Sequence, residues 1–155
     1  NIGYLDKLLF DEKLKPNFED AKFINEYLLK NINLKSAFLP TVKYFYRKRG
    51  EGNSTLDNSN KYSDLYLLVS RRGCLKLLQE NKFYNIFIQS VCLYHFVWQI
   101  KFLINSPEKL YFMDKDEKQR YLELLDENFS YIDNDTIMKF NLASCWFFHK
   151  VGILN

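Results

Sequence analysis

The feature that most constrains the fold is a long apolar stretch at residues 85–105, which predicts a helix that is hydrophobic nearly all round. By length alone this helix could be mistaken for a membrane span. However, polar side chains scatter around it, and ionisable groups are costly in the middle of a bilayer. We therefore interpret it as the buried central helix of a bundle. The polar residues in question are Gln89, Ser90, His95, Gln99 and Lys101.

Sequence periodicity predicts further helices and a few short strands around this central element. The additional helices are expected at 19–30, 62–79 (interrupted near Gly73), 116–128, 135–140 and 142–151. The strands are expected at 8–10, 37–39 and 42–46. The expected fold class is therefore mainly α with a small β part (α+β). Its expected domains are residues 1–60 and a helical domain at residues 61–155.

Length, charge and cysteine usage limit the classes of protein to consider. A chain of 155 residues corresponds to one domain or to a piece of a larger protein. Because it opens on neither Met nor a signal peptide, we expect an excised C-terminal piece of a longer protein. A net charge of +3 is too weak to indicate nucleic-acid binding. The three cysteines are scattered, which favours a reduced, cytosolic setting over a disulfide scaffold.

Two adjacent carboxylates, Glu19 and Asp20, open the helix predicted at 19–30. The positive end of the helix dipole favours the charged form of such groups, so Asp20 is a candidate general base. The alternative is structural. Asn17 would be the helix N-cap, and Asp20, three residues on, would complete a capping box.

A tight basic cluster follows at Tyr46-Arg47-Lys48-Arg49, next to a loop rich in Gly, Asn and Ser. On a strand, Arg47 and Arg49 would point the same way, and their planar guanidinium groups suit two-point contact with phosphate. Ser54 and Thr55 could donate hydroxyl hydrogen bonds to the same phosphates. The alternative is a solvated, positively charged edge strand, which discourages edge pairing between proteins.

Taken together, these segments resemble the C-terminal portion of a family 2 nucleotide-sugar glycosyltransferase with the GT-A fold, followed by the helical appendage found in bacterial surface-polymer synthases. The matching segments are Phe10-Asp11-Glu12, Pro16-Asn17-Phe18-Glu19-Asp20, Tyr27-Leu28-Leu29, Tyr46-Arg47-Lys48-Arg49 and Ser54-Thr55-Leu56-Asp57, with Gln89, Tyr94, Trp98 and Tyr131-Ile132-Asp133 in the helical part.

The resemblance implies the C-terminal edge of a GT-A α/β domain followed by a helical bundle, and an inverting sugar transfer. Asp20 would be the catalytic base with Glu19 beside it, and Arg47, Arg49, Ser54 and Thr55 would bind the donor diphosphate. The partners would be a nucleotide-sugar donor and a glycan or lipid-linked acceptor, as in capsule or teichoic-acid-like polymer synthesis. The enzyme would be cytoplasmic or peripheral at the inner face of the membrane.

The same resemblance implies what this chain lacks. Family members carry a nucleotide-binding half and a metal-binding Asp-x-Asp motif upstream of the Glu-Asp helix. A divalent metal, Mg²⁺ or Mn²⁺, is therefore expected in the full-length enzyme and none in this fragment, which alone should be inactive. Two further matches to Asp-x-Asp, at 114–116 and 133–135, are better explained by helix capping.

The remaining residues of chemical interest have structural explanations that we prefer. His95 and His149 have no second metal ligand at helical spacing, so packing is the expected role. Two aromatic groups are expected to pack in the core in preference to forming a surface that stacks on a sugar: Tyr94 with Trp98, and Trp146-Phe147-Phe148. Arg71-Arg72 is expected to be a solvated turn.

Two other function classes remain open at this point. The chain could be a helical interaction or oligomerisation module without catalytic residues, in which the basic cluster is only a charged rim. It could also bind nucleic acid through residues 43–49, although the modest net charge and the lack of a second basic patch in the sequence count against this.

In the enzyme interpretation, the strands expected in residues 1–60 have lost the sheet with which they would pair. The isolated fragment is then expected to cover the exposed surface by self-association or local disorder.

Overall fold

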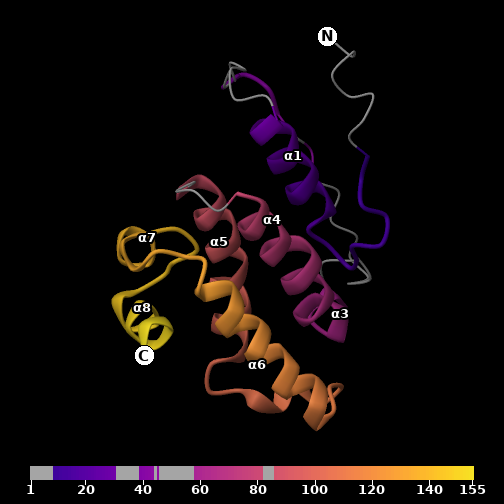
Figure 1. Cartoon of the computed structure of the whole chain (residues 1–155), viewed down its shortest axis with the longest axis vertical. Helices are drawn as coiled ribbons and strands as arrows, with labels where there is room; N and C mark the ends of the chain where they lie inside the picture. The colour runs from indigo at the N-terminus through magenta and orange to yellow at the C-terminus, as the bar shows by residue number, and fades with distance from the viewer. Residues whose placement is uncertain (1–8, 31–38, 44, 46–57, 82–85) are drawn as a thin grey trace.

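The computed structural model describes residues 9–30, 39–43, 45, 58–81 and 86–155, and all regular structure in these residues is helical (Figure 1). The α-helices are α1 (Glu19–Lys30), α3 (Ser63–Tyr66), α4 (Lys76–Glu80), α5 (Ile86–Leu103), α6 (Lys115–Phe129), α7 (Asn134–Lys139) and α8 (Phe147–Leu154). A π-helical segment, η2 (Val69–Leu75), separates α3 from α4, and a 3₁₀ segment, η3 (Pro107–Leu110), precedes α6.

The expected α+β fold class is wrong for this part of the chain, because none of the described residues lies in a strand. Where a strand was expected at 8–10, Phe10 instead stacks on Phe23 of α1, with ring centroids 4.4 Å apart. Leu39 begins a turn, in which the Val42 N–H donates to its carbonyl over 3.2 Å. β-Propensity reflects packing against neighbouring strands, and no such partner exists among the described residues. A GT-A sheet edge is therefore not present there.

The run α3–η2–α4 confirms the prediction of a helix interrupted near Gly73. The irregular backbone coincides with a side chain from another helix. The Asn128 amide of α6 donates to the Ser70 carbonyl over 3.3 Å and to the Leu124 carbonyl over 2.7 Å. Asn128 is fully buried, so this amide joins α6 to the π-helical segment inside the core. A π-bulge inside a helical run often lies near a functional site.

Helix α5 runs behind α4 and α6 and supplies the centre of the core (Figure 1). Its inner face is buried through Ile88, Cys92, Leu93, Phe96 and Val97. Its outer face is exposed, so the prediction of a buried central helix holds for one face of α5 and is wrong for the other. By length and composition α5 could also cross a membrane, a test that core helices of other proteins pass as well.

Residues 9–30 pack on the same core as the helices that follow. Leu14 is 1% exposed and Phe18 is 8% exposed, and both belong to the cluster that contains the buried face of α5. Helix α1 lies beside α4 in Figure 1 and contacts η2. The predicted bounds of α1, residues 19–30, are confirmed.

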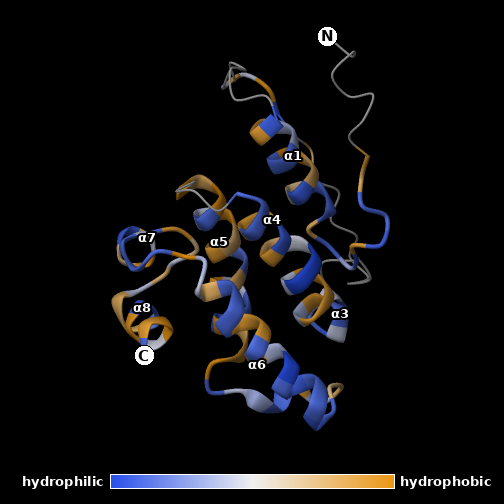
Figure 2. Cartoon of the chain, viewed as in Figure 1, coloured by the Kyte–Doolittle hydropathy of each residue, from blue (hydrophilic) through white to orange (hydrophobic). Residues whose placement is uncertain are grey.

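The C-terminal part is tied to α5 by a reciprocal pair of hydrogen bonds. The Gln89 amide donates to the Asp133 carboxylate over 2.9 Å, and the Asp133 N–H donates to the Gln89 carbonyl oxygen over 3.0 Å. Helix α8 begins at Phe147, later than the predicted residue 142. The intervening Ala143 and Ser144 have left-handed backbones, φ 54° and 49°, which a helix cannot contain. Helix α8 is largely hydrophobic (Figure 2), and its side chains Phe147 and Phe148 are exposed.

Candidate functional site

The two predicted catalytic carboxylates lie in the first turn of α1. Asp20 is exposed, its Oδ1 accepts the N–H of Ala21 over 2.7 Å, and no described residue donates to its Oδ2. Glu19 is partly buried, and its Oε2 has no hydrogen-bond partner among the described residues. The expected capping box does not form, because the Asn17 Oδ1 is buried without a partner among the described residues. The Asp20 carboxylate nevertheless accepts a first-turn N–H, which is the contact that a structural role of this residue requires.

Phe18 fixes where these carboxylates point. Its backbone has φ 80°, a strained value for a residue with a side chain, and its buried ring packs on Gly73 of η2. A Cβ atom at Gly73 would lie 2.7 Å from the ring's Cδ1 atom, so only glycine allows this approach. The ring also meets His95 of α5 edge-on at 5.0 Å. Phe18 thus joins the start of α1 to both η2 and α5.

An ion cluster of Asp11, buried Lys22 and exposed Arg72 holds the segment before α1 in place. Asp11 accepts Arg72 at two points, Nε over 2.6 Å and Nη2 over 2.8 Å, and accepts Lys22 Nζ over 2.8 Å. These hydrogen bonds, first that of Arg72 and then that of Lys22, hold the pKa of Asp11 well below its usual range. The predicted turn is wrong, because Arg72 lies in the π-helical segment η2, although its side chain is 43% exposed, as a solvated residue should be. Arg72 instead docks residues 9–18 onto η2.

A groove of about 1070 Å³ separates the first turn of α1 from the outer face of α5. We call it the aromatic groove, and its defining residues are Asn17, Glu19, Asp20, Tyr94, His95 and Trp98. The volume lies at the upper end of the range for ligand pockets, about 300–1,000 Å³. Carboxylates and aromatic rings that are far apart in the sequence therefore line one cavity.

Tyr94 and Trp98 are not in the core, contrary to the prediction. They are 45% and 52% exposed and contact each other edge-on, with centroids 6.4 Å apart. The Lys101 ammonium lies 5.2 Å from the Trp98 ring centroid and donates to the Ala143 carbonyl over 2.7 Å. Lys101 thus contacts both the indole of Trp98 and the left-handed turn that precedes α8.

A buried hydrogen-bond chain leads from the core to His95. Tyr121 Oη donates to Gln99 Oε1 over 2.8 Å, and the Gln99 amide nitrogen lies 2.9 Å from His95 Nε2 and donates to the Leu65 carbonyl over 3.0 Å. Burial lowers the pKa of His95 to about 4 and raises that of Tyr121. His95 is therefore neutral at physiological pH, and this network was not anticipated from the sequence.

The other sequence-predicted positions divide into two groups. Arg47, Arg49, Ser54 and Thr55 lie outside the described residues, so the structure does not place the donor-diphosphate site. The downstream aspartates have structural partners. Asp114 forms a capping box with Glu117 at α6, while Asp133 bonds Gln89.

Metal-ligating side chains do not cluster in the described ranges, where no three His, Cys, Asp or Glu residues gather. His149 accepts the Trp146 N–H at Nδ1 over 2.9 Å, which places it at the start of α8 as a cap. The metal that the resemblance implies was expected in the upstream half of the full-length enzyme, so no described residue is assigned to it and no chemical step is derived through it.

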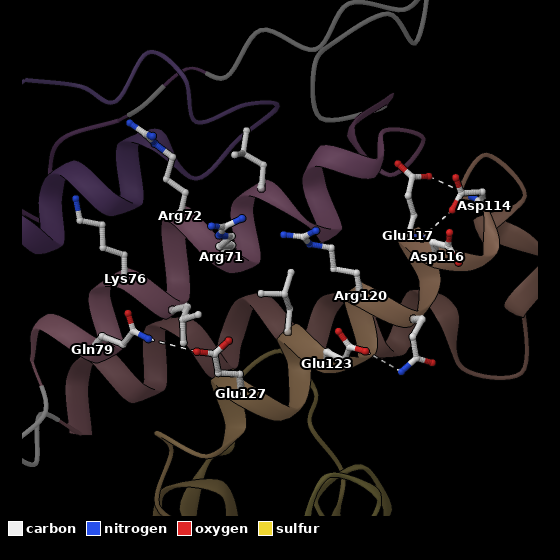
Figure 3. Close-up of a pocket in the computed structure, with 14 residues that line it drawn as sticks. Arg71, Arg72, Lys76, Gln79, Asp114, Asp116, Glu117, Arg120, Glu123 and Glu127 are labelled. Atoms are coloured by element: carbon white, nitrogen blue, oxygen red, sulfur yellow. Dashed lines mark hydrogen bonds between the residues drawn. The ribbon is translucent and has the colours of Figure 1, made fainter.

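A second groove, of about 1090 Å³, lies between η2, α4 and α6 (Figure 3). We call it the charged groove. In Figure 3 the guanidinium groups of Arg71 and Arg120 point toward one another across it. Its walls mix both signs of charge and contain neither Glu19 nor Asp20. The charged residues are Arg71, Arg72, Lys76, Asp114, Asp116, Glu117, Arg120, Glu123 and Glu127.

Comparison with known proteins finds two relatives, both from Bacillus subtilis (strain 168). The chain is 27% identical over 156 residues to the minor teichoic acid biosynthesis protein GgaB, a match that covers 96% of this chain and 16% of GgaB. It is 38% identical over 92 residues to the minor teichoic acid biosynthesis protein GgaA, which covers 57% of this chain and 20% of GgaA. The chain thus spans at most a fifth of the length of these relatives. No protein-family profile and no solved structure matches it.

Proposed function

We propose that this chain is part of a glycosyltransferase that builds a cell-wall polymer of the teichoic-acid type. The observation that carries the proposal is the aromatic groove, where Glu19 and Asp20 face the exposed rings of Tyr94 and Trp98. The names of the two relatives support the polymer class. The likeness of Phe18-Glu19-Asp20 to family 2 enzymes supports the reaction type.

In the proposed reaction, an acceptor hydroxyl attacks the anomeric carbon of a nucleotide sugar from the face opposite the leaving group. The new C–O bond forms as the bond between the anomeric carbon and the diphosphate oxygen breaks, and the nucleoside diphosphate departs. The hydroxyl proton passes to Asp20, to whose Oδ2 no described residue donates while Oδ1 accepts the Ala21 N–H. Phe18 holds the carboxylate at the groove, so positioning supplies part of the rate.

The donor would be held by Arg47 and Arg49, with Ser54 and Thr55, through charge-assisted hydrogen bonds to the diphosphate. The divalent metal, Mg²⁺ or Mn²⁺, belongs in this proposal to the full-length protein. The acceptor would be a glycan or lipid-linked chain at the inner face of the membrane.

The test is sugar transfer by the full-length enzyme with Asp20→Asn. Turnover should fall by orders of magnitude while donor affinity stays nearly unchanged, because a base acts mainly in the transition state. Asp116→Asn is the matched control, since Asp116 also lies in the first turn of a helix but lines the charged groove. Activity of Asp20→Asn within a few-fold of wild type would show that Asp20 is not the base.

A second candidate function is a helical interaction or oligomerisation module. Trp146, Phe147 and Phe148 at the start of α8 favour it, since they are 65%, 67% and 61% exposed. Apolar side chains grouped in this way commonly mark a protein contact. On this alternative, full activity would survive Asp20→Asn, while Phe147→Ser would change the oligomeric state in sedimentation.

A further inference from the structure

Two buried acceptor atoms in the aromatic groove have no donor within the described part of the chain. They are Asn17 Oδ1 and Glu19 Oε2, and they flank Phe18 at the start of α1. Buried polar atoms are nearly always hydrogen-bonded in folded proteins, and each exception calls for an explanation. A ligand with several hydroxyl groups that displaces the atoms covering them would supply the missing donors.

On the facing wall of the groove, His95 offers the complementary group. The Gln99 amide nitrogen must donate to the Leu65 carbonyl, because that oxygen cannot donate, and its second N–H then points at His95 Nε2. Nε2 is therefore the unprotonated nitrogen, and the neutral ring carries its proton on Nδ1. No partner for Nδ1 is found in the described segments, so this N–H is available to the groove.

Aromatic and charged groups restrict the shape and charge of the ligand. The exposed faces of Tyr94 and Trp98 can pack against a flat ring with C–H groups on one side. The carboxylates of Glu19 and Asp20 disfavour an anion, and the Lys101 ammonium directs two of its three N–H donors at the Ala143 and Ser144 carbonyls. An uncharged ring with hydroxyl groups satisfies both conditions.

We infer that the aromatic groove binds an uncharged sugar ring, with Asn17 and Glu19 accepting hydrogen bonds from its hydroxyl groups, His95 Nδ1 donating one, and Tyr94 and Trp98 packing against its face. That this ring belongs to the acceptor rests on the proposed function. In that role it would present its reacting hydroxyl to Asp20. His95 would be a binding residue and would transfer no proton.

The test is titration of the isotopically labelled chain with uncharged methyl glycosides of hexoses and N-acetylhexosamines, followed by NMR chemical shifts. At least one glycoside should bind saturably, with shifts confined to α1 and the outer face of α5. Trp98→Ala should weaken that binding about fivefold, and Trp146→Ala, an exposed indole outside the groove, should leave it unchanged. Cyclohexanol, which has the ring without the hydroxyl groups, should bind more weakly.

Two substitutions separate recognition by His95 from loss of folding. His95→Gln can still accept from Gln99 but loses the donor at the Nδ1 position, and it should weaken glycoside binding about fivefold. His95→Asn places an amide near Nδ1 and should restore much of the binding. Shifts outside the groove, no saturable binding, or equal losses for both His95 variants in chains that remain folded would overturn the inference.

These outcomes are distinguishable from failure of the proposed function. Glycoside binding in the groove together with an active Asp20→Asn enzyme would retain the sugar site and remove the catalytic role. If Asp20→Asn loses activity but the chain binds no glycoside, the catalytic role of Asp20 is retained and the sugar site is removed.

Discussion

The two grooves of this protein have nearly the same volume, about 1070 and 1090 Å³, but differ in how their polar groups are satisfied. In the charged groove, acids and bases of neighbouring helices share one solvated surface, where Gln79 bonds Glu127 and Gln119 bonds Glu123. In the aromatic groove, two buried acceptors have no donor among the described residues, and aromatic rings are exposed. Volume therefore does not distinguish the two grooves, whereas unsatisfied buried polar atoms beside exposed rings favour the aromatic groove as the candidate site.

After the Asp20→Asn substitution, the largest difference between the two grooves is expected in the effects of Glu19→Gln and Glu123→Gln on the acceptor KM. Glu19 should contribute a charged acceptor to a bound ring, and hydrogen bonds to charged groups contribute about 1.5–3 kcal/mol. Glu19→Gln should therefore raise the acceptor KM at least tenfold in steady-state assays of the full-length enzyme. Glu123 is exposed in the charged groove, and its substitution should change KM by less than about twofold. Equal effects would erase the distinction between the grooves.

The next contrast concerns cations. Removing Arg47 or Arg49 should weaken nucleotide-sugar binding by about 1.5–3 kcal/mol in calorimetry, the scale for hydrogen bonds to charged groups. Lys48→Ala should have a smaller effect. Arg120→Ala, in the charged groove, is the control and should leave donor affinity unchanged. Small, purely salt-dependent losses at all the basic positions would favour a solvated rim over a diphosphate clamp.

The anchoring of the aromatic groove is tested by two glycines. Gly73→Ala would place a Cβ atom 2.7 Å from Phe18 Cδ1 and should lower the free energy of unfolding by about 1–3 kcal/mol. Because Phe18 also holds the carboxylates, kcat should fall as well. Gly152→Ala, in α8, meets no atom within 4 Å and should be neutral or stabilising by about 0.5–1 kcal/mol. Denaturant unfolding measures the stability change of each glycine variant. A stable, fully active Gly73→Ala enzyme would show that the contact between Phe18 and Gly73 does not position the site.

Local periodicity was sufficient to predict most helices, and it failed where tertiary contacts decide. The helical spacing of apolar residues at 19–30 predicts α1, and Gly73 predicts the interruption at the π-helical segment. Both signals lie in the local sequence. The segments up to residue 46 that are rich in β-forming residues predicted strands, and the described residues contain none. Whether Phe10 pairs with a strand or stacks on Phe23 depends on partners that its own sequence does not specify.

The candidate site was only half visible in the sequence. Glu19 and Asp20 stand out as neighbouring charges, but Tyr94, His95 and Trp98 sit in an apolar stretch that looks like core. Their exposure depends on which side of α5 the other helices cover. A signal was present, since Phe87, Val91, Tyr94 and Trp98 recur at helical spacing and line one face of α5.

The smallest predicted effect is the pH dependence that His95 gives to stability. Its pKa is about 4 in the folded chain because of burial, below the ordinary value of 6.5 that applies after unfolding. Between these values the unfolded chain binds a proton at His95 that the folded chain does not. The free energy of unfolding should therefore fall as the pH drops from about 6.5 to about 4, by roughly 1–2 kcal/mol at pH 5 relative to pH 7.5.

His95→Gln is the variant that isolates this contribution, because it removes the titrating ring and keeps an acceptor for Gln99. Asp11, whose pKa is also lowered, loses stabilising contacts only at more acidic pH and does so in both chains. The difference in unfolding free energy between wild type and variant should therefore change by 1–2 kcal/mol, within about a factor of two, between pH 7.5 and pH 5 in urea unfolding. A constant difference would mean that His95 is protonated as easily in the folded chain as in the unfolded one. The groove would then carry a charged imidazolium near pH 6, and the argument for an Nδ1 donor on a neutral ring would fail.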